Sequence, residues 1–127
     1  MTGRGVLLFA HGARDPRWSA PFEQVAQRLR AHDPTLSVQL AYLEFMTPNL
    51  RDAGEALVGA GCSRVDVVPL FLGAGGHVRK DLPALLDTLR TAHPAVEWRL
   101  QRAIGEVESV VDAMARAALN CLDEPTP

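Results

Sequence analysis

The chain has 127 residues, of which 47% are hydrophobic, and it carries a formal net charge of -2 at pH 7. This length is enough for one hydrophobic core and short for two, so we expect residues 1–122 to form a single domain and residues 123–127 a frayed tail. The weak acidity argues against binding to nucleic acid or to a membrane surface, because both need a basic face. No apolar run approaches the roughly 18 residues of a membrane span, and the first run is short for a signal peptide, so we expect a cytoplasmic protein.

Strand and helix patterns alternate strictly along the chain. The strand patterns are runs of apolar residues. The helix patterns repeat apolar side chains at helical spacing, and several begin near a capping residue or a proline. Strands are expected at 5–10, 36–43, 64–72 and 96–100, and helices at 19–32, 47–58, 81–90 and 105–122.

Three helices carry more specific expectations. Ser19 is expected to cap the first helix and Thr47 the second. The last helix repeats apolar residues on one side, and that side is expected to point inward. The inward residues would be Val107, Val110, Val111, Met114 and Leu119.

Strict alternation predicts an α/β fold of three layers, flavodoxin-like, with a four-stranded parallel sheet in the order 2-1-3-4. In this order the first and third strands are neighbours, and the connections that follow them leave toward opposite faces of the sheet. A crevice forms beyond the carboxyl ends of such strands, and ligands commonly bind there.

Polar residues follow three of the strands at this edge. His11 comes directly after the first strand, Glu44 follows the second, and His77 is expected in the loop after the third. Imidazole and carboxylate groups suit a divalent ion such as Co, Fe, Ni or Zn, and they would equally form an acid-base set. The alternative is that all three residues have no function and are solvated loop residues, with the Glu44 carboxylate favouring a helix N-terminus.

The glycine-rich stretch Gly73 to Gly76 precedes His77. It is a weak match to a phosphate-binding loop, because it has neither the third glycine of G-x-G-x-x-G nor a G-K-[ST] ending. We interpret Gly75 and Gly76 instead as removing side-chain bulk beside His77, which makes room for a large flat ligand.

Four basic residues flank the two histidines in this otherwise acidic chain. Guanidinium and ammonium groups pair with carboxylates, so these residues are candidates for orienting an acidic substrate, and the alternative is a solvated charged rim. They are Arg14, Arg17, Arg79 and Lys80.

Three stretches, "LLFAHGARDPRW", "AYLEFMTPNL" and "VVPLFLGAGGHVRKDLP", resemble the CbiX/SirB family of class II tetrapyrrole chelatases in its short single-domain form. The resemblance extends from Gly5 to about Ala118. It implies insertion of Co²⁺, Fe²⁺ or Ni²⁺ into sirohydrochlorin or a related tetrapyrrole without nucleotide, with His11, His77 and Glu44 in the active site. No tightly bound cofactor is implied, because the metal is a co-substrate. The resemblance also implies a homodimer with two copies of the site at one cleft.

Two other functions stay open from the sequence. A non-catalytic carrier of tetrapyrrole or metal would use the same ligands. A histidine phosphatase-like enzyme would also place His-Gly at a strand end, but its Arg-His-Gly pattern is broken by Ala10.

Overall fold

The computed structural model describes residues 3–73 and 75–123, with the backbone alone for residues 76–79. Four strands form one parallel sheet in the order β2-β1-β3-β4, as predicted. The strands are β1 (Gly3–Ala10), β2 (Ser37–Tyr42), β3 (Cys62–Pro69) and β4 (Glu97–Leu100).

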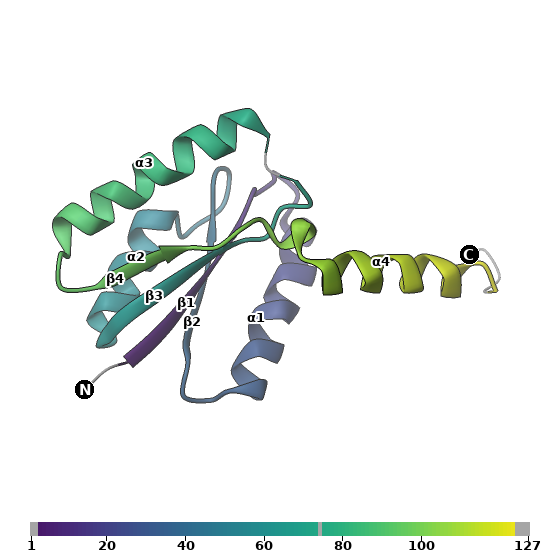
Figure 1. The fold of residues 1–127 in the computed structure, drawn as a ribbon, viewed down its shortest axis with the longest axis horizontal. Coiled ribbons are helices and arrows are strands. Elements are labelled where there is room, and N and C mark those ends of the chain that lie inside the picture. The colour runs from purple at the N-terminus through teal and green to yellow at the C-terminus, as the bar shows by residue number, and fades with distance from the viewer. Residues whose placement is uncertain (1–2, 74, 124–127) are drawn as a thin grey trace.

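Helices lie on both faces of this sheet (Figure 1). The helices are α1 (Ala20–His32), α2 (Leu50–Gly59), α3 (Gly76–Ala92) and α4 (Glu108–Cys121), with short 3-10 turns η1 (Pro16–Ser19) and η2 (Ile104–Glu106). The larger core joins α2 and α3 to the sheet through fully buried residues such as Leu57, Leu86 and Val67. A smaller core joins α1 to the opposite face through Leu8 and Ala26. The connections after β1 and β3 therefore lead to opposite faces of the sheet, as predicted.

Ser19 takes the N-cap position of α1 as predicted, but its side chain makes no capping hydrogen bond, and the predicted cap at Thr47 is wrong. Ser19 has helical backbone angles because it ends η1, and its hydroxyl contacts the Glu23 carboxylate at 3.1 Å instead of capping α1. Thr47 does not cap α2, because the Thr47-Pro48 segment belongs to the return from β2, where the Pro48 carbonyl accepts the Tyr42 N–H at 2.9 Å. Asn49 caps α2, and its side chain accepts the N–H of the residue three positions later at 2.8 Å.

The third helix begins earlier than predicted. α3 starts at Gly76, and Pro83 lies inside it, whereas the sequence pattern placed Pro83 in the first turn of a helix from Asp81. His77 is consequently in the first turn of α3 and not in a loop. Among the described helices, none is long and apolar enough to cross a membrane.

The last helix does not point its apolar side inward. Figure 1 shows α4 extending away from the sheet, and Val111, Met114 and Leu119 are 42%, 41% and 64% exposed. Of the five residues predicted to point inward, only Val107, which precedes α4, and Val110 in its first turn are half-buried. Helical spacing of apolar residues indicates that one side of a helix seeks an apolar surface, but it does not specify which surface.

Candidate functional site

His11 and Glu44 lie side by side because the pairing of β1 with β2 continues past both strands. The Leu43 N–H donates to the Ala10 carbonyl at 3.0 Å, and the Glu44 N–H donates to the His11 carbonyl at 3.1 Å. The two side chains meet above this backbone, with His11 Nε2 3.3 Å from Glu44 Oε1. Since their side chains are 52% and 49% exposed, the pair is accessible to a ligand.

Gly12 allows the two connections to approach this closely. Its φ is +94°, a conformation that favours glycine, and a Cβ built on it would lie 1.9 Å from the Glu44 carbonyl oxygen. No side chain fits in that space. The glycine after His11 therefore sets the distance between the histidine and the glutamate.

The chain that leaves β3 forms a wall beside His11. The Leu70 N–H donates to the Phe9 carbonyl at 2.7 Å, which places the following Phe71 next to the end of β1. The Phe71 ring meets the His11 ring edge to face, with centroids 6.1 Å apart, and it also packs against Phe9. The imidazole thus has a fixed aromatic neighbour on one side and Glu44 on another.

A positive charge lies next to the pair. Phe45 follows Glu44 with φ of +66° and is 55% exposed, and the Arg14 guanidinium carbon lies 4.5 Å from the centre of its ring. Such a cation-π contact restrains an exposed arginine. Arg14 is therefore held against the residue that follows Glu44.

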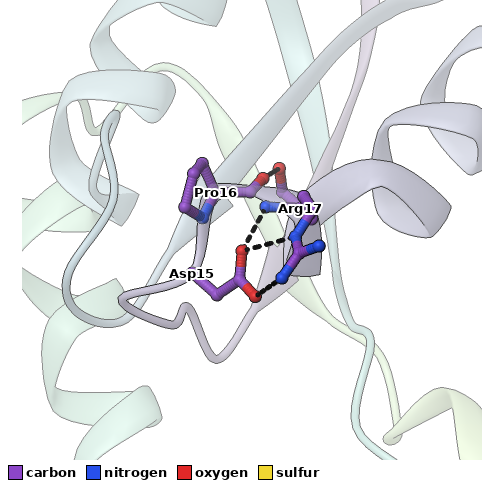
Figure 2. A network of polar contacts seen from close by, with 4 residues as sticks. Asp15, Pro16 and Arg17 are labelled. Carbon is purple, nitrogen blue, oxygen red and sulfur yellow. Dashed lines mark hydrogen bonds and ion pairs between the residues drawn. The ribbon is translucent and has the colours of Figure 1, made fainter.

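The Arg17 side chain binds Asp15 of its own loop. Figure 2 shows its guanidinium against Asp15, with Nη2 3.1 Å from Oδ2 and Nε 3.3 Å from Oδ1, while Oδ1 also accepts the Arg17 backbone N–H at 2.9 Å. These hydrogen bonds lower the pKa of Asp15. In this structure Arg17 is bound by its own loop.

The third group of predicted residues lies at the start of α3. The side chains of His77 and Arg79 are outside the described residues, and Gly76 is described by its backbone alone. Gly75 precedes the first helical turn in an extended conformation, and a Cβ there would meet nothing within 4 Å. Lys80 is exposed. The convergence of His77 on His11 therefore stays a prediction.

Among the described side chains, no group of three or more histidine, cysteine, aspartate or glutamate residues is placed to bind one metal ion. The described part of the candidate ligand set is the pair His11 and Glu44.

Sequence reasoning missed three residues of the site: Gly12, Phe45 and Phe71. The position of Gly12 after a strand-end histidine was an available indication of a tight approach. Phe45 gave no such indication, because a positive φ is uncommon for a large side chain. Phe71 was interpreted as part of the third strand, which ends before it.

The sequence profile of the CbiX family matches residues 5–120. The sirohydrochlorin cobaltochelatase of Priestia megaterium is 29% identical over 111 residues, which cover 87% of this chain but only 36% of that protein. This chain is thus much shorter than that relative.

Two solved structures show the same fold. A putative cobalamin (vitamin B12) biosynthesis CbiX protein from Marinobacter aquaeolei VT8 superposes with a TM-score of 0.82 at 33% identity, covering 94% of this chain and 98% of that one. SirB from Bacillus subtilis, solved with Fe³⁺, superposes with a TM-score of 0.81 at 25% identity, covering 98% of this chain and 49% of SirB. The chain therefore matches one short relative along nearly its whole length and about half of a long one.

Proposed function

The chain belongs to the CbiX family, and from this premise we propose that it inserts Co²⁺, Fe²⁺ or Ni²⁺ into sirohydrochlorin or a related tetrapyrrole, without nucleotide, in cobalamin or siroheme biosynthesis. The name of one relative, a sirohydrochlorin cobaltochelatase, supports the substrate, and that of another, a putative cobalamin biosynthesis protein, supports the pathway. The observation that supports the chemistry is the accessible pair of His11 and Glu44 at the carboxyl edge of the sheet.

The spacing of the pair suits a shared ion. First-row metals bind imidazole nitrogen and carboxylate oxygen at about 2.1 Å. Two donors separated by the observed 3.3 Å would then subtend about 104° at the ion, between octahedral and tetrahedral angles. Two protein ligands, or three with His77, leave coordination positions free for the nitrogens of the tetrapyrrole. Such a site binds the ion and can also release it.

Insertion also requires proton removal. The divalent ion replaces two pyrrole N–H protons, so two protons leave for each metal that enters the ring. As the tetrapyrrole nitrogens take over the ion, the imidazole and carboxylate that bound it become free to accept those protons. We assign metal capture and proton removal jointly to His11, Glu44 and His77.

The substrate has peripheral carboxylates, and the basic residues near the site are their proposed partners. The Arg14 guanidinium lies over the ring of Phe45, the residue after Glu44, and Lys80 is exposed on α3. Arg17 would leave the Asp15 carboxylate and bind a carboxylate of the substrate instead. Arg79 is proposed as a further partner of the substrate from its position in the sequence alone. The open space at Gly75, with its neighbour Gly76, is proposed to admit the face of the macrocycle.

We also propose that the protein acts as a homodimer whose two copies face one cleft. A flat macrocycle needs two walls, and a single small domain offers one. A two-fold partner supplies the second.

One experiment separates this proposal from the alternatives. Sirohydrochlorin and Co²⁺ are mixed with a small molar fraction of the protein, and the absorbance change of the tetrapyrrole is followed. Many turnovers per protein, above the rate without protein, support a chelatase. A change that stops at one equivalent indicates a non-catalytic carrier. Release of phosphate from a phosphomonoester, with no metal insertion, would indicate a phosphatase-like enzyme.

A further inference from the structure

Glu44 lies in a short loop that closes on itself between β2 and α2. The Tyr42 N–H, at the end of β2, donates to the Pro48 carbonyl at 2.9 Å, and Asn49 then caps α2. Within this loop the Glu44 N–H donates to the His11 carbonyl at 3.1 Å. Both ends of the loop are therefore fixed, and the direction of Glu44 depends on the turn that follows it.

That turn is centred on Phe45. The Met46 N–H donates to the Glu44 carbonyl at 2.8 Å, only two residues back along the chain, and Phe45 between them has φ of +66°. Such a hydrogen bond around a residue of positive φ defines the rarer and more strained kind of γ-turn. Among the described residues, Phe45 is the only one other than glycine with a positive φ. Backbone strain of this kind persists only where neighbouring contacts maintain it, and it is concentrated at functional sites.

A cation, and not burial, keeps the Phe45 ring in place. The ring is on a residue that is 55% exposed, and the Arg14 guanidinium carbon lies 4.5 Å from the ring centre. The negative face of an aromatic ring attracts such a cation. Arg14 belongs to the connection after β1 and Phe45 to the connection after β2. Their contact therefore joins the two segments that carry His11 and Glu44.

The turn fixes the backbone on both sides of Glu44. Its N–H is bound by the His11 carbonyl, and its own carbonyl is bound by the Met46 N–H and packed against Gly12. From this backbone the side chain reaches His11, with Oε1 3.3 Å from Nε2. Because the loop is closed at its end, a negative φ at Phe45 would rotate the peptide after Glu44 and take the Met46 N–H away from it. The distance between the two side chains thus depends on the conformation of Phe45.

We propose that Phe45 is a positioning residue for Glu44. The strained turn centred on it, maintained by Arg14 against its ring, keeps the Glu44 carboxylate at the distance from His11 that a shared divalent ion requires. Phe45 acts through Glu44 and not by touching the ion or the tetrapyrrole. The inference rests on the proposed function, because it takes His11 and Glu44 as ligands of the metal substrate.

The first test measures the affinity of the full chain for Co²⁺ alone by isothermal titration calorimetry. Phe45→Ala removes the ring but keeps the steric cost of a positive φ, so the turn should relax. We expect the affinity to fall about 10–100-fold, which is typical when a residue that orients a metal ligand is lost. Phe45→Trp keeps a ring for Arg14 and should bind Co²⁺ as the natural chain does. Phe45→Gly adopts a positive φ without steric cost and should lose less affinity than Phe45→Ala.

The contribution of the cation is measured in the same way. Arg14→Ala removes one cation-π contact from an exposed ring, which corresponds to a loss of about 2–5-fold in Co²⁺ affinity. Gly61→Ala is the matched control for strain, because it also places alanine at a positive φ, here +90°. Gly61 lies against Gly3, at the opposite end of β1 from the site, so its variant should bind Co²⁺ normally.

Glu44→Gln separates this inference from the proposed function. If Glu44→Gln binds Co²⁺ as tightly as the natural chain, the carboxylate is not a metal ligand, and both the proposed site and the inference are wrong. If Glu44→Gln binds Co²⁺ weakly while Phe45→Ala binds it normally, the site is correct and only the role of Phe45 is wrong. A Phe45→Gly chain that loses as much affinity as Phe45→Ala would also overturn the inference, because the backbone conformation would then not matter.

The second test observes the turn itself and needs no metal. Hydrogen exchange of the Met46 amide, followed by NMR, should be slow in the natural chain and in Phe45→Trp and faster in Phe45→Ala. Far-UV circular dichroism and thermal melts establish that each variant is folded. A folded Phe45→Ala chain that keeps slow Met46 exchange and natural Co²⁺ affinity, but has a raised KM for sirohydrochlorin, would show that the ring contacts the substrate. That result would contradict a positioning role.

Discussion

Gly12→Ala tests whether the close approach of the two strand ends positions His11 and Glu44 for the proposed catalysis. A Cβ at this position would lie 1.9 Å from the Glu44 carbonyl oxygen, and real contacts of this kind are at least 3.0 Å. The two connections must therefore separate by about 1.1 Å, which breaks the contact between His11 and Glu44. Because a displacement of about 1 Å can reduce a rate by about 10²-fold, we expect that loss in metal insertion.

Gly61→Ala is a matched control for the backbone strain. Gly61 also has a positive φ, +90°, but a Cβ there would meet nothing within 4 Å. Both variants should lose about 1–2 kcal/mol of unfolding free energy from the unfavourable φ, and Gly12→Ala should lose more because of the clash. Thermal melts measure the stability, and the absorbance change of sirohydrochlorin with Co²⁺ measures the rate. A Gly12→Ala protein at the natural rate, or a Gly61→Ala protein slowed as strongly, would refute the reasoning.

Three further predictions follow from the site. His11→Ala should lower kcat by about 10²–10⁴-fold while tetrapyrrole binding, followed by fluorescence quenching, is largely kept; near-normal turnover at saturating substrates would remove its catalytic role. Arg14→Ala should chiefly raise the KM for the tetrapyrrole in steady-state kinetics. The control Arg28→Ala, on the exposed surface of α1, should leave this KM unchanged. Equal effects of the two substitutions would contradict substrate orientation by Arg14. Asp15 has a lowered pKa through its bonds to Arg17, so its contribution to stability is present above a pH of about 4 and is lost as pH falls through the folded-state pKa. The Tm of Asp15→Asn should accordingly fall below that of the natural protein near neutral pH and converge with it in acid; a constant difference across pH would exclude this origin.

The sheet could be predicted from the sequence because each strand is specified by residues that are close together in the chain. Apolar runs bounded by glycine and proline define the strands, and strict alternation with helices permits few topologies. The adjacency of His11 and Glu44 followed from that order, since residues directly after neighbouring parallel strands must lie close together.

The parts that were mispredicted depend on contacts between distant segments. The start of α3 was misplaced because the glycine-rich stretch and His77 were interpreted as a loop, whereas the helix begins at Gly76. The packing of α4 was misplaced because its apolar repeat specifies a need for burial and not the surface that satisfies it. The requirement for glycine at position 12 was missed because it comes from the backbone carbonyl of Glu44, which lies 32 positions later in the chain.

The central claim is that His11 and Glu44 act as one unit on one metal ion. A double-mutant cycle tests it most directly, with kcat for Co²⁺ insertion measured for the natural protein, His11→Ala, Glu44→Gln and the double variant. Residues that act together lose their function together, so we expect the double variant to be about as slow as the slower single variant. If the two losses multiply instead, or if Glu44→Gln keeps the natural rate, His11 and Glu44 do not act as one unit on the metal ion.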